Sequence, residues 1–274
     1  VLDKFTTEKA CATTANVFTT VSATTANEAE KIFGRRPDIL PNGLAIDLFP
    51  TFEETSYQHR KNKPKLYEYV MSHFFPYQKF DLTHTLFFYT SGRYEFENKG
   101  IDISIEALGK LNQQLKDEGS KRTIVMFFFM AMNARGPKRE LLENKSHVEG
   151  LSSDVHDKEH FFMQRIMLDV MLGDQINIDV VPKDFVSELR RKFKYLRRNG
   201  NPPINTHHMN NEEHDAIINN CQCVGLQNRA EDKVKVVFLP AYLSGREGLI
   251  NMEYNEAVSG AHKRLVLSYS VASH

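Results

Sequence analysis

One stretch, from His84 to Leu115, constrains the fold of this chain more than any other. It opens with the run 86–89 (LFFY), which is apolar and rich in aromatic residues and therefore indicates a buried strand. A polar loop at 91–100 follows. After the loop, isoleucines and leucines recur at helical spacing as far as Gly119, the expected stop. Strand, loop and helix in this order predict an α/β fold, in which ligands bind outside the carboxyl ends of the strands.

The loop carries two fixed cations, Arg93 and Lys99, just before the expected helix start. The N–H groups at a helix start favour anions. An arginine can bind phosphate oxygens bidentately, and a lysine adds a point charge. Together they could hold a diphosphate and stabilise the charge that develops as it leaves. The alternative is an ordinary solvated loop whose cations pair with Glu95 and Glu97, because charged side chains are common on surfaces.

The string GRYEFENKG at 92–100, followed by EALGKLN at 106–112, closely resembles the eukaryotic glycogen synthases, which carry GRYEF-x-NKG and EALARLN. A string with this many fixed letters is far more specific than a lone glycine pattern. The resemblance implies a retaining enzyme that transfers glucose from UDP-glucose to the non-reducing ends of glycogen in α-1,4 linkage. It also implies that Arg93 and Lys99 bind the UDP diphosphate.

The resemblance covers most of the chain and implies its domains. The segment 16–44 is similar to the end of the family's first domain and the crossing into the second. Residues 1–50 are therefore expected to hold the end of an N-terminal Rossmann-like domain and the crossing. Residues 51–274 are expected to form the C-terminal Rossmann-like, nucleotide-binding domain, with a helical insertion at about 139–200. The expected fold is thus α/β, the C-terminal half of a GT-B glycosyltransferase.

Local patterns add further elements. The run 16–22 (NVFTTVS) reads as a strand, and Thr24 or Thr25 could cap the helix that follows it. Two prolines and an Asn-Gly pair make 37–44 a turn-dense crossing. The apolar run 123–132 predicts a second core strand, with 133–137 as a breaker. The segment 232–240 resembles a buried parallel strand of the family.

A long polar helix is expected from Thr51 to Phe75, where the family forms part of the pocket for its allosteric activator, glucose 6-phosphate. The residues that match this pocket are Glu54, His59, Lys63 and His262. Glu53 stands where the family has a histidine, so an anionic ligand would meet an extra negative charge and bind more weakly. The alternative is that 59–63 is only a basic, solvated face.

Two helices are expected in the insertion, which in the family contributes to tetramer contacts. The first, at 158–173, would carry Phe162, Ile166 and Val170 as a stripe. The second, at 185–198, is basic and amphipathic. It could bind polysaccharide, a membrane surface or a partner, or it could pack its apolar stripe and leave its cations in solvent.

The same region contains one metal-binding pattern, because His156, Glu159 and His160 spell H-x-x-E-H, the inverted zinc-protease motif. No third ligand is identifiable, and five-residue motifs match by chance. We expect no metal. In this family, side chains and the helix start do what a cation does in other transferases.

Composition narrows the partners. Lys+Arg and Asp+Glu both number 35, and this balance argues against nucleic acid. Three cysteines make no disulfide framework, so a reducing cytoplasm is expected. The longest apolar run is far shorter than the roughly 20 residues of a membrane helix, so no membrane partner is expected. The resemblance implies glycogen as a partner, UDP-glucose as donor substrate with no separate cofactor, and a homo-oligomer. It leaves glucose 6-phosphate and glycogenin open as partners.

The last residues depart from the family. The chain ends AHKRLVLSYSVASH, whereas the family continues CHLGVFPSYYEPWGYTPAE, with the catalytic glutamate region and the uracil-stacking tyrosine. Val271 stands where the first glutamate should be, so no catalytic residue is identifiable. We expect a fragment or a shifted reading frame, inactive alone because half a site should not turn over. The alternative is a catalytically dead relative that binds sugar phosphate or forms oligomers and acts only in regulation.

Overall fold

The structure is a computed structural model that describes residues 2–43, 51–172 and 181–241. The chain divides into two compact units, residues 1–49 and 50–274. The first unit contains two helices and two short strands: α1 (Leu2–Thr14), β1 (Thr19–Thr20), α2 (Ala23–Phe33) and β2 (Asp38–Ile39). The two strands pair in parallel, with Thr19 opposite Asp38.

The start of α2 differs from the sequence expectation. The cap is Ser22, and neither Thr24 nor Thr25 takes that role. The Ser22 hydroxyl accepts a hydrogen bond from the Thr25 backbone, and the Thr25 hydroxyl accepts one from the Ser22 backbone, both at 3.2 Å. This reciprocal pair satisfies two N–H groups that the helix leaves without partners, and it ends the strand early.

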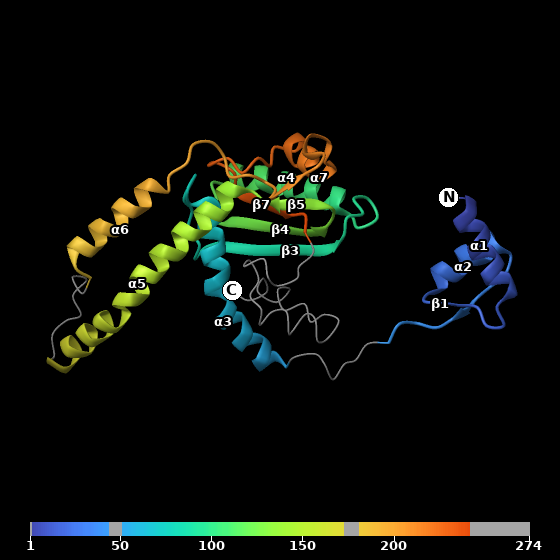
Figure 1. The fold of residues 1–274 in the computed structure, drawn as a ribbon, viewed down its shortest axis with the longest axis horizontal. Coiled ribbons are helices and arrows are strands. Elements are labelled where there is room, and N and C mark those ends of the chain that lie inside the picture. Colours follow the sequence, from blue (N-terminus) through green and yellow to red (C-terminus); the bar gives the residue numbers. More distant parts are fainter. Residues whose placement is uncertain (1, 44–50, 173–180, 242–274) are drawn as a thin grey trace. The chain divides into compact units, whose positions relative to one another are not determined.

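The second unit is built on a three-stranded parallel sheet in the order β3-β4-β7 (Figure 1). Its strands are β3 (Thr85–Arg93), β4 (Thr123–Ala131) and β7 (Val234–Leu239). Its helices are α3 (Phe52–Phe74), α4 (Ile101–Asp117), α5 (Arg139–Leu172), α6 (Lys183–Tyr195) and α7 (Ala216–Cys223), with a 3-10 turn at Glu212–His214. A second, two-stranded sheet pairs β5 (Ala134–Pro137) with β6 (His207–Met209).

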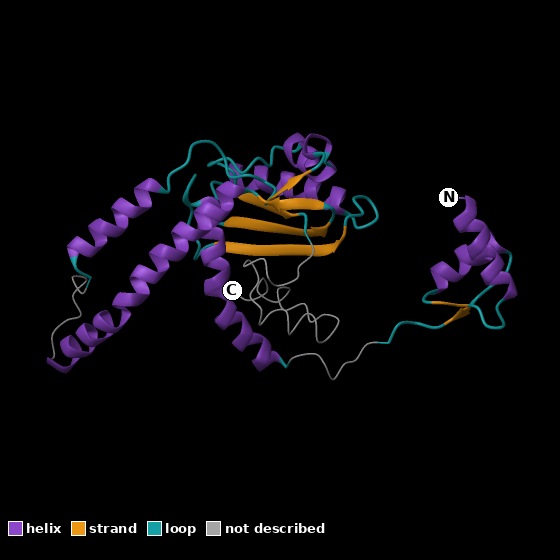
Figure 2. Ribbon diagram, in the orientation of Figure 1, coloured by secondary structure: helices purple, strands orange, loops and turns teal. Residues whose placement is uncertain are grey.

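Alternate residues of the central strand β4 face opposite sides of the sheet, as a β-strand requires. Met126 and Phe128 pack with α4, α7 and β7 on one side. Phe127 and Phe129 pack with the last turns of α3 on the other. Helices therefore cover both faces of the parallel strands (Figure 2), which explains why β4 is apolar along almost its whole length.

Two elements of the structure differ from their sequence predictions, one in its extent and one in its kind. The helix expected at 158–173 is part of α5, which begins at Arg139. Gly150 and the polar residues after it stay helical, because none of them prevents a helical backbone as proline does. The predicted breaker at 133–137 contains a strand, β5, which pairs antiparallel with β6 some 70 residues later. Among the described residues, no helix has the length and apolar character to cross a membrane.

Candidate functional site

The candidate site lies at the carboxyl end of β3, where the chain turns into α4. The strand is longer than the apolar run predicts, because its pairing with β4 continues to Arg93, opposite Ala131. Arg93 is therefore the last residue of a strand and its position is fixed by the sheet. Gly100 caps α4 with φ +63°, a left-handed conformation that favours glycine.

Both cations that the sequence singled out are at this end of the strand. The Arg93 side chain is 79% exposed, and its Nη2 lies 3.2 Å from Glu95 Oε1. Lys99 is exposed as well. Its stem crosses the end of β3, since a Cβ built on Gly92 would lie 3.9 Å from Lys99 Cε. The pairing with Glu95 that the solvated-loop alternative expects is thus present for Arg93, but an exposed ion pair is weak and leaves the guanidinium open to an anion.

The loop between the two cations is folded on itself by backbone hydrogen bonds. The N–H of Lys99 donates to the Glu95 carbonyl, and that of Ile101 donates to the Phe96 carbonyl, both at 3.0 Å. Phe96 also packs against the core cluster on the α4 side of the sheet. The loop is therefore a compact turn with an apolar anchor in its middle.

Tyr94 ties the loop to a distant helix, a contact that the sequence analysis missed. Its hydroxyl donates to Asp215 Oδ2 at 2.7 Å, and its ring lies 6.2 Å from that of Phe238. Burial, and then the hydrogen bond and charge of Asp215, raise the pKa of Tyr94. Asp215 directly precedes the apolar start of α7, which marks it as a helix cap. Its link to Tyr94 spans 121 residues and leaves no local signal.

One negative charge sits in the first turn of α4, because Asp102 is the second residue of that helix. Within the described part of the chain, its buried Oδ1 has no hydrogen-bond partner. A carboxylate at this position is stabilised by the helix N-terminus. It therefore takes up part of the positive potential that would otherwise act on a bound anion, and leaves more of that task to Arg93 and Lys99.

The second group of candidate residues lies on α3. His59 and Lys63 are one turn apart and share a face, and burial followed by the charges of Lys63 and Arg60 lowers the pKa of His59. Lys63 Nζ lies 5.5 Å from the Tyr67 ring centroid. Glu54 is nine residues from Lys63, about two and a half turns, so the two face opposite sides of the helix.

Glu54 already has a structural role at the start of α3. The Thr51 N–H donates to Glu54 Oε2 at 2.9 Å, and the Glu54 N–H donates to Thr51 Oγ1 at 3.2 Å. The structure thus brings His59 and Lys63 together and places Glu54 apart from them. The fourth candidate, His262, lies outside the described residues.

The zinc pattern is on the exposed face of α5. His156 Nδ1 lies 2.8 Å from Glu159 Oε2, and Gln164 donates to His160 Nε2 at 2.9 Å. In the ranges that the structure describes, no group of three or more histidine, cysteine or acidic side chains could hold a metal ion. These contacts are the ordinary pairs of a solvated helix surface.

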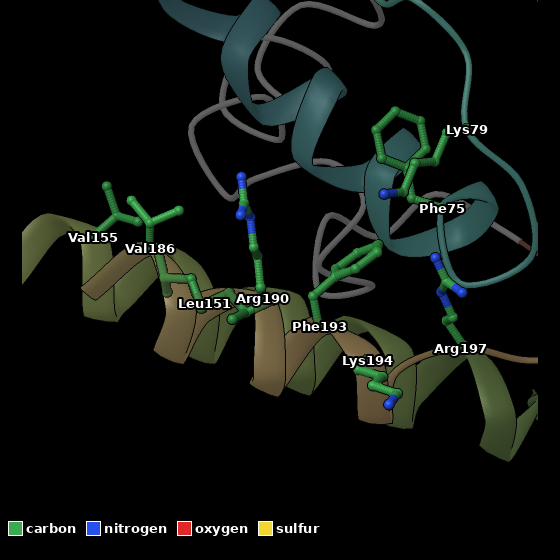
Figure 3. A pocket seen from close by; sticks show the side chains of 10 residues that line it. Phe75, Lys79, Leu151, Val155, Val186, Arg190, Phe193, Lys194 and Arg197 are labelled. Atoms are coloured by element: carbon green, nitrogen blue, oxygen red, sulfur yellow. The ribbon is translucent and has the colours of Figure 1, made fainter. Parts of the chain in front are cut away.

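A pocket of about 700 Å³ lies between α5, α6 and the end of α3 (Figure 3). Val186, Leu189 and Phe193 of α6 line it, and Lys79 Nζ lies 4.6 Å from the Phe193 ring centroid. Helix α6 is thus amphipathic as predicted, with its apolar side facing the pocket. The pocket shares no residue with the loop after β3.

Taken together, the second unit is an α/β structure with a parallel sheet, covered by helices on both faces, and with two cations at the carboxyl end of a strand. This arrangement defines the class of α/β proteins that bind ligands beyond the ends of their parallel strands. Within this class, the sequence identifies one family. The glycogen synthase family model matches residues 1–272, and the chain belongs to the glycogen synthase family.

Individual relatives agree with this assignment. Glycogen [starch] synthase of Neurospora crassa is 36% identical over 268 residues, which cover 96% of this chain and 38% of that protein. Isoform 2 of Saccharomyces cerevisiae is 38% identical over 274 residues, covering 96% and 39%. The liver form of Mus musculus is 34% identical over 264 residues, covering 96% and 38%. The chain spans about two fifths of the length of these relatives.

Proposed function

We propose that this chain is the donor-nucleotide-binding part of a glycogen synthase. The enzyme transfers glucose from UDP-glucose to the non-reducing end of glycogen with retention, in α-1,4 linkage. In this proposal the second unit is the C-terminal Rossmann-like domain of a GT-B enzyme and the first unit is the end of the N-terminal one. The observation that carries it is the pair of exposed cations, Arg93 and Lys99, at the carboxyl end of β3 in a chain of this family.

The role of each cation follows from its chemistry. Arg93 is held by the sheet, so its guanidinium can bind diphosphate oxygens bidentately once the weak pair with Glu95 exchanges for phosphate. Lys99 adds a flexible point charge from the other side of the loop. Both also balance the charge on UDP as it leaves. The donor is a substrate and the reaction needs no separate cofactor. The cysteines among the described residues are free thiols, which supports a cytoplasmic location.

The test is UDP binding to this chain by calorimetry, with Lys99→Ala as the matched variant. The chain should bind UDP and the variant should bind it more weakly, because one phosphate contact is lost. In the complete enzyme, Arg93→Ala should abolish most transfer and leave the fold intact, since the side chain is largely exposed. Turnover equal to that of the unmodified enzyme would refute the site.

For α3 we propose a smaller set of activator-binding residues than the family resemblance implies. His59 and Lys63 face a sugar phosphate such as glucose 6-phosphate, while Glu54 shapes the helix start.

We also propose that the enzyme is a homo-oligomer. Supporting this, the last turns of α5 carry several exposed apolar side chains, which a second copy would cover: Met167, Leu168, Val170, Met171 and Leu172. The mass of the complete protein by light scattering tests this.

A further inference from the structure

We infer that Tyr94 and Asp215 form a positioning pair. The pair holds the loop in the orientation in which Arg93 and Lys99 can both bind the diphosphate of the donor. The inference rests on the proposed function, because it concerns the same site. Neither residue touches the nucleotide in this scheme. Tyr94 follows Arg93 directly and donates its hydroxyl hydrogen to Asp215 Oδ2 at 2.7 Å.

Asp215 is suited to this task because it is itself held in place. It is 6% exposed, and its other carboxylate oxygen, Oδ1, accepts a hydrogen bond from the Ile218 N–H at 3.0 Å as the cap of α7. One oxygen therefore fixes the helix and the second fixes the loop. A carboxylate whose two oxygens both have partners has little freedom to turn away.

The two ends of the loop are anchored to helices that pack closely against each other. Tyr94, at its start, is tied to α7, while Gly100, at its end, begins α4. Helix α4 approaches the end of α7 so closely that a Cβ built on Gly109 would lie 2.7 Å from Val224 Cβ. Loop, α4 and α7 thus form a closed frame, in which the Tyr94 hydroxyl is the side-chain link between the loop and α7.

The consequence for binding is preorganisation. A loop that is already in its bound shape loses less conformational entropy when the diphosphate arrives. Without the hydroxyl, the Tyr94 ring can still pack on Phe238, so the loop should stay folded but vary in direction. The side chain of Arg93 would be affected first, because Tyr94 is the next residue. The sheet fixes the backbone of Arg93, but its guanidinium is held by a weak, exposed pair with Glu95.

Tyr94→Phe tests the pair by removing only the hydroxyl oxygen. We expect UDP affinity to fall about fivefold to tenfold, because part of the binding free energy is then needed to order the loop. Tyr69→Phe is the matched control, since the Tyr69 hydroxyl is also buried but has no partner among the described residues and lies on α3. It should leave UDP affinity unchanged. Asp215→Asn should restore much of the wild-type affinity that Asp215→Ala loses, because asparagine also caps helices and its amide can hydrogen-bond to the phenol.

The decisive measurement is non-additivity. If Tyr94 acts through the two cations, Tyr94→Phe should have no further effect on UDP affinity in an Arg93→Ala/Lys99→Ala background. An equal loss in both backgrounds, with a lowered melting temperature, would make the pair merely structural and overturn the inference. Unchanged affinity in Tyr94→Phe, while Lys99→Ala binds UDP more weakly, would overturn the inference and leave the proposed function standing. A wild-type chain that does not bind UDP would overturn both.

Discussion

The loop after β3 and the helix α3 both carry basic side chains that we propose bind phosphate, but the fold holds them in different ways. The loop is confined by a strand at one end, a helix at the other, and contacts to residues more than a hundred positions away. On α3, His59 and Lys63 occupy the half that precedes the buried end of the helix. Arg60 and Tyr67, which lie near them, belong to the same helix.

This difference matters for the energetics of binding. Cations that tertiary contacts have already placed can bind an anion without ordering the chain first, whereas cations on an exposed helix face must order their own side chains. The buried end of α3 has a separate task. Val70 and Phe74 pack on the sheet, so this end secures the helix while its first half remains available to solvent.

The largest effect is expected from removing both loop cations. Arg93→Ala/Lys99→Ala should weaken UDP binding by about 4 kcal/mol, roughly a thousandfold, because each loses a charge-assisted contact. Arg60→Ala/Lys63→Ala is the matched control, with the same change in net charge on α3. Calorimetry at one salt concentration compares them. If the α3 variant loses as much UDP affinity as the loop variant, binding reflects overall charge and the contrast between the two regions fails.

A second prediction concerns acid stability and the two histidines of α3. Burial lowers the pKa of His73 to about 4, helped by the charge of Lys138, although the hydrogen bond to the Pro203 carbonyl at 2.9 Å opposes the shift. The unfolded chain binds this proton with a pKa near 6.5. Between these values the unfolded state binds more protons, so stability falls as pH drops from about 6.5 to about 4. The loss is on the order of 3 kcal/mol.

The measurement is urea unfolding at pH 7 and pH 4.5 for the wild type, His73→Gln and His59→Gln. Glutamine at position 73 can still donate to the Pro203 carbonyl but does not titrate, so its stability should change less between the two pH values. His59→Gln should stay closer to the wild type, because that ring is less buried than the His73 ring and its pKa is lowered less. Comparing variants removes the contribution of the carboxylates. If His73→Gln lost as much unfolding free energy between pH 7 and pH 4.5 as the wild type, His73 would not be the source of the acid sensitivity.

Much of the second unit was predictable because its elements are periodic over many residues. The run at 123–132 and the helical spacing after Gly100 mark β4 and α4, and the capping glycine and the stop at Gly119 are local signals as well. Their parallel pairing also follows from the strand–loop–helix order. These features depend on residues that are neighbours in sequence.

The missed features depend on partners far along the chain. The extension of β3 to Arg93 comes from its pairing with β4, and β5 exists because β6 lies beside it. The bond from Tyr94 to Asp215 has the same origin. For the site, the sequence therefore identified the two cations but not what holds them. The family resemblance supplied Glu54 as a ligand candidate without showing its contact with Thr51.

The smallest predicted effect separates those two roles of Glu54. Glu54→Ala removes the carboxylate that accepts from the Thr51 N–H, while the backbone N–H at position 54 can still donate to Thr51 Oγ1. The variant should lower stability by about 1 kcal/mol. Glu53→Ala removes the same charge from the same helix turn without touching the cap, so it measures the interaction with the helix dipole alone, about 0.5 kcal/mol. Thermal unfolding gives both values.

The affinity of the complete protein for glucose 6-phosphate, measured in both variants, then shows whether Glu54 is a ligand. Glu54 faces away from Lys63 and is occupied by the cap, so Glu54→Ala should change the affinity no more than Glu53→Ala does. Both should bind slightly more tightly, because each removes a negative charge near an anionic ligand. A clear loss of affinity in Glu54→Ala alone would mean that Glu54 contacts the sugar. The first half of α3 would then be an organised site like the loop after β3, and the contrast between them would fall.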